Sequence, residues 1–519
     1  MRLHDYFDFH AREQPAACFA VLDDRRLTWG EAQREVHRMA HALVRSGVAP
    51  GDRVAILATN CIEYVLFYYA AAKTGAVPVP LNYRLAVPEW QVILEDASSR
   101  FLFARGDLVG AVAALQAELP DIRTWVALDH PAPDGWLSFD DWLGDAPDSA
   151  PQHVAHADDD VYQMYTSGTT GRPKGAVLTH AAVCANAHQL NTIVRAGPTD
   201  RFLIVAPIYH AAAAINVFGV VNQGGTLVIM ADFEPSAVVH ALSEQRITAT
   251  VLVPAMIQAC LVMVPEVAAL TYEYLRYIGY GGSPIAAGTL RHAIEVFGCE
   301  FAQGYGMTEI TAVATALTPK DHHRALTESP DLLLSAGRPL PGTDVRVVDA
   351  DDREVPVGEI GEILVRGPQL MRGYWNMPEA TEKTLNGGWM HTGDAGSVDA
   401  EGFLFVQDRV KDMIISGAEN IYPREVENAL FEHHAIADVA VIGVPDDRWG
   451  ETVKAIVVLR DGHDAYAAEL IEFCRARLAG FKCPHSVDFV DELPRNPSGK
   501  VLKKDLRQPY WEGRTRRVG

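Results

Sequence analysis

The first 150 residues alternate between two hydrophobic periodicities. Residues 28–47 and 63–75 carry apolar side chains at helical spacing, and each stretch stops at a glycine. Residues 52–59 and 76–82 are short apolar runs typical of buried strands. Strands that alternate with helices form parallel sheets whose faces are covered by the helices. We therefore predict an α/β fold for this part of the chain.

The pattern changes along the rest of the 519-residue chain. An α/β stretch continues to about residue 325, and the segment from about 335 to 406 is rich in short strands, as in a small β-barrel or sandwich. A compact α+β tail follows, after charged, turn-prone residues that are typical of a linker. The predicted units are a domain over 1–407, a hinge at 408–411 and a C-terminal domain over 412–519.

Charge and cysteine content argue against several classes of protein. The formal net charge of −22 argues against nucleic acid as a partner, because binding a phosphate backbone needs a dense basic face. The seven cysteines are scattered and form no CxxC pair. This distribution favours a reduced, intracellular protein over a disulfide scaffold or a zinc site.

The sequence carries no signal for export or membrane insertion. Its N-terminus has charges where a signal peptide needs an apolar stretch. The longest apolar runs, residues 64–72 and 211–221, are far shorter than the ~18–20 residues of a spanning helix. We predict a cytoplasmic protein without a transmembrane segment, and a homodimer is left open.

A polar loop, YTSGTTGRPKG at residues 165–175, could not build a hydrophobic core. A strand pattern at 159–165 precedes it, and a helical pattern with Thr179 as N-cap follows it. A strand, a glycine loop and a helix together present backbone N–H groups to an anion. The loop is not a Walker A sequence, because Arg172 and Pro173 separate the second glycine from the lysine. The candidate phosphate-binding residues are Ser167, Gly168, Thr169, Thr170, Gly171 and Lys174.

Three consecutive aspartates, residues 158–160, precede this loop by a few positions. A metal site is one interpretation of such a run. Acidic runs are more often solvated, and we predict a solvated run here.

The loop resembles the phosphate-loop signature of the adenylate-forming superfamily, which contains acyl-CoA synthetases, luciferases and nonribosomal-peptide adenylation domains. Four further motifs follow in that family's order: QGYGMTE at 303–309, HTGD at 391–394, QDRVKDMIISGAENIYPREVE at 407–427 and PRNPSGK at 494–500. Five ordered motifs rarely arise by chance, so the chain is identified as a member of this superfamily. Its motif sequences are most similar to those of bacterial fatty-acyl-CoA ligases.

The resemblance implies an architecture and a reaction. The N-terminal domain would hold two parallel-type α/β sheets plus a small β-barrel, and the C-terminal domain would be small, mobile and α+β. A carboxylate would attack the α-phosphorus of Mg-ATP to give acyl-adenylate and pyrophosphate, and a thiol would then displace AMP. ATP, Mg²⁺ and CoA are therefore the expected cofactor and co-substrates, and a small carboxylate is the expected substrate.

The family's roles fall on particular residues of this sequence. Lys500 would bridge the carboxylate and α-phosphate oxygens, and Asp394 would hold both ribose hydroxyls. Glu309 and Thr166 would offer oxygens to Mg²⁺, and His210 would stand beside the substrate carboxylate. The other implied residues are Thr308 at a phosphate, Gly282, Ser283 and Pro284 beside adenine and the acyl group, Gln303, Gly304, Tyr305, Gly306 and Met307 around the nucleotide, Arg409 at the ribose, Lys411 at the hinge, and Gly417 at the pantetheine tunnel.

Substrate class is less constrained. Small residues at 211–214 would leave an open apolar pocket, which favours a medium or long alkyl chain, or a bulky ring, over acetate. No carrier-protein segment follows Lys500, which favours free CoA as the thiol. The alternatives are an aryl-CoA ligase of the coumarate, ferulate or benzoate type, a ligase for steroid-side-chain acids, transfer to a separate carrier protein, and a non-catalytic adenylate-binding protein.

Overall fold

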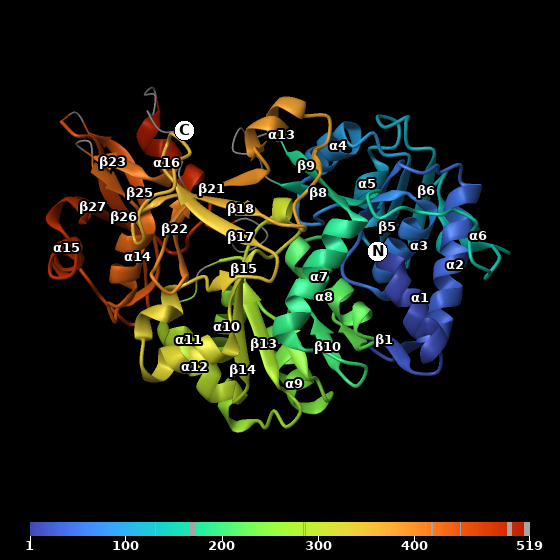
Figure 1. Cartoon of the computed structure of the whole chain (residues 1–519), viewed down its shortest axis with the longest axis horizontal. Helices are drawn as coiled ribbons and strands as arrows, with labels where there is room; N and C mark the ends of the chain where they lie inside the picture. Colours follow the sequence, from blue (N-terminus) through green and yellow to red (C-terminus); the bar gives the residue numbers. More distant parts are fainter. Residues whose placement is uncertain are drawn as a thin grey trace.

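The computed structural model describes residues 1–519 except 130, 167–172, 284, 286, 410–411, 417–418, 447, 496–500 and 513–519, and it describes only the backbone of 408, 409, 419 and 420. In Figure 1 the chain runs from the N-terminal helices at one end of the long axis to the C-terminal strands at the other. Within the described residues the strands form five sheets. The α/β fold class is confirmed.

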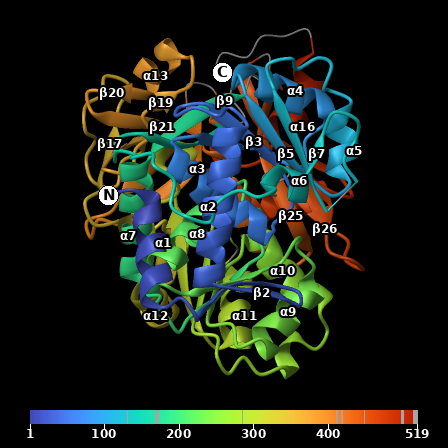
Figure 2. The same cartoon turned by 90° about the vertical axis from the view of Figure 1, so that its right-hand side faces the viewer.

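The first sheet is parallel and has the strand order β4-β3-β5-β6-β7. Its strands are β3 (Arg53–Leu57), β4 (Val77–Pro80), β5 (Phe101–Arg105), β6 (Thr124–Leu128) and β7 (Leu137–Ser138). The helices of this region are α1 (Leu3–Glu13), α2 (Trp29–Arg45), α3 (Ile62–Thr74), α4 (Val87–Asp96), α5 (Leu108–Ala113) and α6 (Phe139–Leu143). Figure 2 shows α1, α2 and α3 side by side, in agreement with their mutual contacts.

The predicted helix at 63–75 is the central element of the core. It is α3, every residue of which is buried, and it ends where Gly75 takes φ +75°. It contacts β4 of the first sheet, and also β1 (Cys18–Leu22) and β8 (Asp160–Thr166), which belong to two other sheets. A helix that is apolar all round is suited to this position between sheets.

The largest sheet has nine strands in the order β16-β15-β14-β13-β12-β10-β11-β1-β2, parallel from β14 to β1. Its strands after β1 are β2 (Arg25–Thr28), β10 (Arg201–Ile204), β11 (Thr226–Ile229), β12 (Ala249–Val251), β13 (Tyr277–Gly281), β14 (Glu300–Tyr305), β15 (Thr315–Leu317) and β16 (Arg338–Pro339). The helices between them are α7 (His180–Val194), α8 (Ala211–Asn222), α9 (Pro235–Glu244), α10 (Pro254–Met263), α11 (Ala287–Phe297) and α12 (Pro319–Thr327).

Two smaller antiparallel sheets adjoin the large one. A three-stranded sheet, β19-β9-β8, contains β9 (Lys174–Thr179) and β19 (Gly373–Tyr374). The strand-rich region forms an antiparallel sheet of β17 (Asp344–Val348), β18 (Gly361–Arg366), β20 (Leu385–Asn386), β21 (Trp389–Val398) and β22 (Leu404–Arg409), with α13 (Pro378–Thr384) beside it. This sheet stands where a small barrel was expected.

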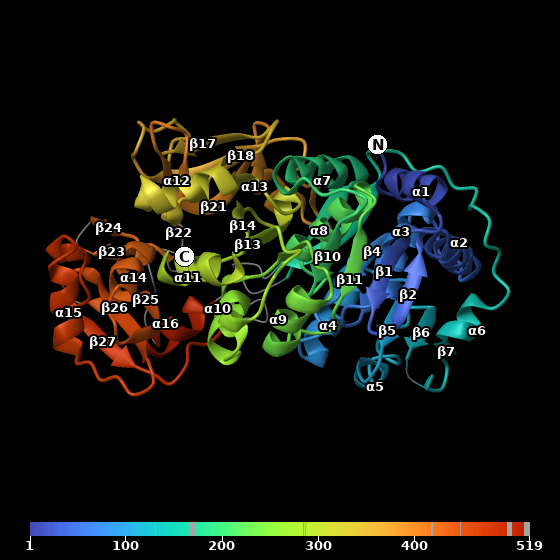
Figure 3. The same cartoon turned by 90° about the horizontal axis from the view of Figure 1, so that it is seen from below.

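The C-terminal residues fold around their own hydrophobic clusters, which draw on residues 414–510 alone. The sheet holds β23 (Ile414–Ser416), β24 (Glu419–Ile421), β25 (Ile436–Asp446), β26 (Gly450–Leu459) and β27 (Ser486–Phe489). Its helices are α14 (Pro423–Phe431), α15 (Ala467–Arg475) and α16 (Lys503–Trp511). Figure 3 shows this unit at one end of the molecule, next to the sheet of β17, β18 and β21. No helix in the described part of the chain is long and apolar enough to cross a membrane.

Candidate active site

The strands on either side of the polar loop, β8 and β9, pair as an antiparallel hairpin. Thr166 at the end of β8 pairs with Lys174 at the start of β9, and the predicted phosphate-binding residues Ser167, Gly168, Thr169, Thr170 and Gly171 lie outside the described residues. The expected order of strand, loop and helix is wrong, because β9 stands between the loop and α7. Residues 176–178 of β9 are apolar and buried, so they continue the sheet. Thr179 is the N-cap of α7, as predicted, and its hydroxyl accepts from the backbone N–H of Ala182.

Two ion pairs hold the base of this hairpin, and the one with Arg53 is largely buried. Asp160 at the start of β8 forms salt bridges of 3.0 Å with Arg53 of β3 and 3.2 Å with Arg372. The Arg53 guanidinium also donates to Gln163 and lies 3.5 Å from the ring centroid of Trp375. The expectation of a solvated acidic run is therefore wrong for Asp160, whose side chain is 16% exposed.

Glu309 lies where three elements meet. It is on a single 3₁₀ turn, Thr308–Ile310, directly after the QGYG motif, and it is 4% exposed. Its Oε1 accepts a hydrogen bond of 2.8 Å from Tyr374 of β19 and one of 3.4 Å from the hydroxyl of Thr166. Lys174 Nζ lies 4.7 Å from the ring centroid of Tyr374. The structure thus brings together three predicted residues, Thr166, Lys174 and Glu309.

The backbone around this turn is tightly constrained. A Cβ added to Gly306 would lie 2.1 Å from the carbonyl oxygen of Ala312, so only glycine fits there. Thr311, just after the turn, has φ +62°, an unfavourable conformation for a β-branched residue. Its hydroxyl donates to the carbonyl of Gln369 at 2.7 Å, which helps to hold this geometry. Strained backbone of this kind clusters at functional sites.

The predicted adenine-side residues lie at the carboxyl ends of two neighbouring parallel strands. Gly282 and Ser283 follow β13, while the QGY segment ends β14 and Gly306 and Met307 continue it. Ligands of open α/β sheets bind at such strand ends. The predicted residues of this group that the structure describes are Gly282, Ser283, Gln303, Gly304, Tyr305, Gly306, Met307 and Thr308. Pro284 lies outside the described residues.

A buried histidine forms a hydrogen bond with a tyrosine of β13. His322 of α12 lies 2.9 Å from the Tyr280 hydroxyl through Nε2 and 2.9 Å from the Thr318 carbonyl through Nδ1. The carbonyl can only accept, so Nδ1 carries the proton and Tyr280 donates to Nε2. Burial lowers the pKa of His322 to about 4, which keeps the ring neutral at neutral pH.

Asp394 projects from β21 and reaches the end of β14. Its Oδ2 accepts a hydrogen bond of 2.7 Å from the Tyr305 hydroxyl, and its side chain is 8% exposed. Across the β21–β22 pair, Asp394 is directly opposite Arg409 in register, although the Arg409 side chain lies outside the described part. The two predicted ribose residues therefore share one hairpin.

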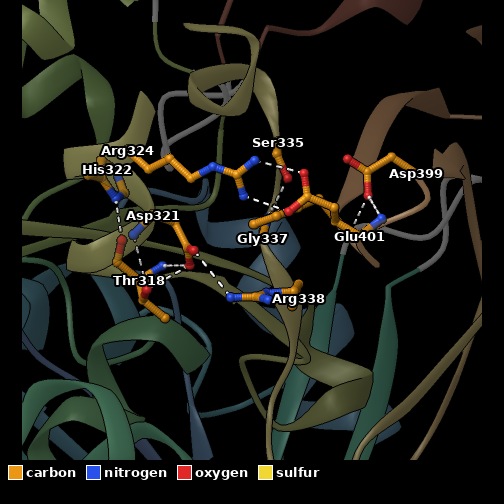
Figure 4. Close-up of polar contacts among 10 residues, drawn as sticks. Thr318, Asp321, His322, Arg324, Ser335, Gly337, Arg338, Asp399 and Glu401 are labelled. Atoms are coloured by element: carbon orange, nitrogen blue, oxygen red, sulfur yellow. Dashed lines mark hydrogen bonds and ion pairs between the residues drawn. The ribbon is translucent and has the colours of Figure 1, made fainter. Parts of the chain in front are cut away.

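Polar contacts attach that hairpin to α12 (Figure 4). Glu401, in the turn between β21 and β22, receives two hydrogen bonds from Arg324, of 2.6 and 2.7 Å. Asp399 accepts from the backbone N–H groups of Glu401 and Phe403, which shapes the turn. Asp321, whose carboxylate caps α12, pairs with Arg338 of β16 at 3.2 Å. The Arg324–Glu401 contact thus attaches the hairpin that carries Asp394 to α12.

His210 stands at the N-cap position of α8, within an aromatic group. Its ring centroid is 4.4 Å from that of Tyr209, which in turn lies 5.4 Å from Tyr83. His210 Nε2 and Tyr209 Oη are buried without a hydrogen-bond partner among the described residues. Burial, and secondarily the charge of Arg84, lowers the pKa of His210 to about 4. Ala211 and Ala214, which were expected to leave space, pack into the large core.

Three further predicted residues lie outside the described part of the chain: Lys411, Gly417 and Lys500. The sequence reasoning also missed Tyr374 and Trp375, which contact the hairpin and Glu309. The only signal for them in the sequence is the GYW run at residues 373–375, which by itself indicates no contact with Glu309.

The donor set suits a magnesium ion held by few protein ligands. In the described ranges no three His, Cys, Asp or Glu side chains gather as a metal cage. Thr166 and Glu309 offer two oxygens, and Mg²⁺ characteristically takes one or two protein oxygens and completes its shell with phosphates and water.

The fold, with Glu309 and Asp394 buried near the strand ends, is that of the adenylate-forming α/β enzymes. The chain belongs to the AMP-binding enzyme family, which it matches over residues 7–375, and residues 425–500 match the C-terminal domain of the same enzymes. Within that family it is one of the adenylate-forming acyl- and aryl-CoA ligases.

Three known proteins illustrate the range of its relatives. The chain is 41% identical over 501 residues to a feruloyl-CoA synthase of Amycolatopsis, covering 96% of this chain and 97% of that one. It is 39% identical over 517 residues to the fatty acid–[acyl-carrier-protein] ligase ScoC of Streptomyces coeruleorubidus, covering 98% and 96%. The solved structure of a Mycobacterium tuberculosis fatty acyl CoA synthetase matches with a TM-score of 0.75 at 35% identity, covering 98% of each chain.

Proposed function

We propose that the protein is an ATP-dependent, AMP-forming ligase that activates a medium- or long-chain fatty acid and transfers the acyl group to CoA. The observation that carries this proposal is the convergence of Tyr305, Asp394, Glu309 and Thr166, from four separate elements, beside the carboxyl ends of β13 and β14. The similarity to fatty-acid and acyl-CoA enzymes supports it further.

The nucleotide would be held by chemically matched groups. Tyr305 offers an aromatic face to adenine, and Asp394 offers a carboxylate to two ribose hydroxyls. Lys174 and the hydroxyls of the hairpin loop would bind the phosphates, with Thr308 as a further contact. A magnesium ion at Glu309 and Thr166 would supply positive charge next to the triphosphate.

The first half-reaction would join substrate and nucleotide. A carboxylate oxygen attacks the α-phosphorus, and the bond to pyrophosphate breaks. Lys500 would stabilise the charge that develops on the carboxylate and α-phosphate oxygens. His210 would border the carboxylate as a neutral imidazole, in keeping with its lowered pKa.

The second half-reaction would use the same site after a domain rotation. Lys411 would absorb the backbone change in a hinge at 408–411, between a domain over 1–407 and one over 412–519. Arg409 would contact the ribose of the nucleotide, and Gly417 would line the pantetheine tunnel. The CoA thiol then attacks the acyl carbon, and AMP leaves with the oxygen that came from the carboxylate.

A second candidate substrate is a hydroxylated aromatic acid. Tyr209 carries a buried hydroxyl without a partner in the described part of the chain, inside the aromatic group around His210. Such an unpaired phenol would suit a substrate ring that carries its own hydroxyl. The identity to a feruloyl-CoA synthase points the same way.

A panel of acids with purified protein tests both candidates. Pyrophosphate release and thioester formation should be measured with octanoate, palmitate, ferulate, benzoate and a steroid-side-chain acid, each with CoA and with a holo acyl carrier protein. We expect the highest kcat/KM with a fatty acid and CoA. A preference for ferulate would favour the aryl candidate, thioester on the carrier alone would reassign the acceptor, and no pyrophosphate with any acid would leave an adenylate-binding protein.

A further inference from the structure

Tyr374 contacts two charged side chains of the candidate nucleotide site, Lys174 and Glu309. It ends β19, a two-residue strand that pairs with β9 through Tyr374 and Ala176. The flanking backbone N–H groups of Arg372 and Trp375 donate to carbonyls of Val177 and Gly175, at 2.8 and 2.7 Å. The strand is therefore fixed to the hairpin that carries Lys174.

The same segment donates two hydrogen bonds to Glu309, one to its side chain and one to its backbone. The Tyr374 hydroxyl donates to Oε1 of Glu309 at 2.8 Å, and the backbone N–H of Met371 donates to the Glu309 carbonyl at 2.9 Å. Thr166 also donates to Oε1. Within the described part of the chain, Oε2 of Glu309 receives no hydrogen bond, which leaves that oxygen for a cation.

The aromatic ring has a second role that the hydroxyl does not share. Lys174 Nζ lies 4.7 Å from the ring centroid, within the range of a cation–π interaction. Thr381 of α13 holds the backbone, because its hydroxyl accepts from the Tyr374 N–H at 2.8 Å. One side chain thus contacts the phosphate-loop lysine through its face and the metal-site carboxylate through its hydroxyl.

We propose that Tyr374 is a positioning residue that orients Glu309 for magnesium and Lys174 for the phosphates of ATP. This inference rests on the proposed function, since it assumes that Glu309 and Lys174 serve Mg-ATP. The two roles are separable: the hydroxyl governs the response to metal, and the ring governs the binding of nucleotide in the absence of metal.

Tyr374→Phe removes the hydroxyl alone. Loss of a hydrogen bond that orients a metal ligand typically weakens metal affinity about 10-fold or more. We expect the Mg²⁺ concentration for half-maximal thermal stabilisation by ATP to rise about 10-fold, with the affinity for ATP in EDTA unchanged. Tyr374→Leu removes the ring as well and should weaken ATP binding in EDTA too. Thermal melts at fixed ATP over a series of Mg²⁺ concentrations measure the first quantity, and calorimetric titration with ATP in EDTA measures the second. Neither needs an acyl substrate.

The chain contains a matched control. Tyr510 donates its hydroxyl to Asp488 and lies under Lys454, whose Nζ is 5.0 Å from the ring centroid, in the C-terminal unit. Tyr510→Phe removes the same kind of hydrogen bond and should leave the magnesium response unchanged. Equal melting temperatures of wild type and Tyr374→Phe in EDTA without nucleotide would show that the variant is folded.

A double-mutant cycle separates positioning from a general structural effect. In a Glu309→Gln background the carboxylate is gone, so Tyr374→Phe should have no further effect on magnesium dependence. Additive effects, or a Tyr374→Phe protein with the magnesium response of wild type, would overturn the inference. If no acid supports pyrophosphate release but the magnesium shift appears, the proposed function fails and the role of Tyr374 stands.

Discussion

The Tyr305 hydroxyl donates a hydrogen bond of 2.7 Å to Oδ2 of Asp394, a residue 89 positions further along the chain. This contact joins the end of β14 in the large sheet to β21 in the antiparallel sheet. It places an aromatic face and a carboxylate side by side, as a nucleoside would require. Because Asp394 is nearly buried, its orientation is set by the protein before any ligand arrives.

Asp394→Asn should weaken ATP binding and abolish the preference of the protein for ATP over 2′-deoxy-ATP. The amide replaces one of the two accepting oxygens by an NH₂ donor and removes the charge, and hydrogen bonds to charged groups are worth ~1.5–3 kcal/mol, or about 10- to 100-fold in affinity. Kd values for ATP and 2′-deoxy-ATP measure the effect: wild type should prefer ATP, and Asp394→Asn should not. Asp488→Asn, at another carboxylate bound by a tyrosine, is the control. A retained preference for ATP would show that Asp394 does not hold the ribose.

Lys500→Ala should block the first half-reaction selectively. Removing a positioned charge from a developing oxyanion typically lowers the rate about 10²- to 10³-fold. Pyrophosphate release should fall by that factor, whereas synthetic acyl-adenylate should still react with CoA at a rate near that of wild type. Rapid-quench assays of the two steps provide the measurement. Equal losses in both half-reactions would mean that Lys500 has another role.

Stability should fall as the pH is lowered from about 6.5 towards 4. Burial lowers the pKa of His4 to about 3 and those of His180, His210 and His322 to about 4. At these four positions the unfolded chain takes up protons below the ordinary histidine pKa of ~6.5, whereas the folded protein takes them up only at about pH 4 or below. Urea denaturation across this range should show the loss.

His4→Leu isolates one contribution to that loss. The variant should flatten the dependence of the unfolding free energy on pH between 6.5 and 4, because one buried group no longer takes up a proton on unfolding. An unfolding free energy that is independent of pH over this range would contradict the assignment of neutral buried histidines.

The cysteines should be slow to react in the native state. All seven are free, and burial raises the pKa of five of them, Cys61, Cys184, Cys260, Cys299 and Cys474, to about 12. Since the thiolate is the reactive form, Ellman's reagent at mildly alkaline pH should modify these thiols slowly. Unfolding in guanidinium chloride should release all seven. Rapid reaction of most thiols in the folded protein would contradict this burial.

The sequence predicts the elements whose signals are local. The helix at 63–75 and the strands around it follow from periodicity, and Thr179 follows from capping chemistry. Such local patterns do not indicate which strands pair with each other across the chain. Strands β1 and β2 precede the first sheet in the chain, yet they join the sheet built mainly from residues 201–339. A short apolar strand has the same appearance in either sheet.

Candidate site residues could be predicted where they belong to a recognisable motif. Residues that join the site through contacts with distant parts of the chain could not. Glu309 and Asp394 could be named from their motifs, although their functions remain predictions. Tyr374 could not be assigned, because its contact with Glu309 spans 65 positions and depends on the pairing of β19 with β9. The sequence pattern did not predict β9, all six residues of which pair with β8, because only residues 176–178 of the strand are apolar.

The proposed function requires that the carboxylate form a mixed anhydride with AMP before a thiol attacks it. The most direct test uses a fatty acid labelled with oxygen-18 in its carboxylate, together with ATP, Mg²⁺ and CoA, and mass spectrometry of the nucleotide product. Attack on the α-phosphorus leaves one labelled oxygen on AMP when the thiol takes the acyl group, and that is the result we predict. Unlabelled AMP, or ADP with labelled phosphate, would contradict it.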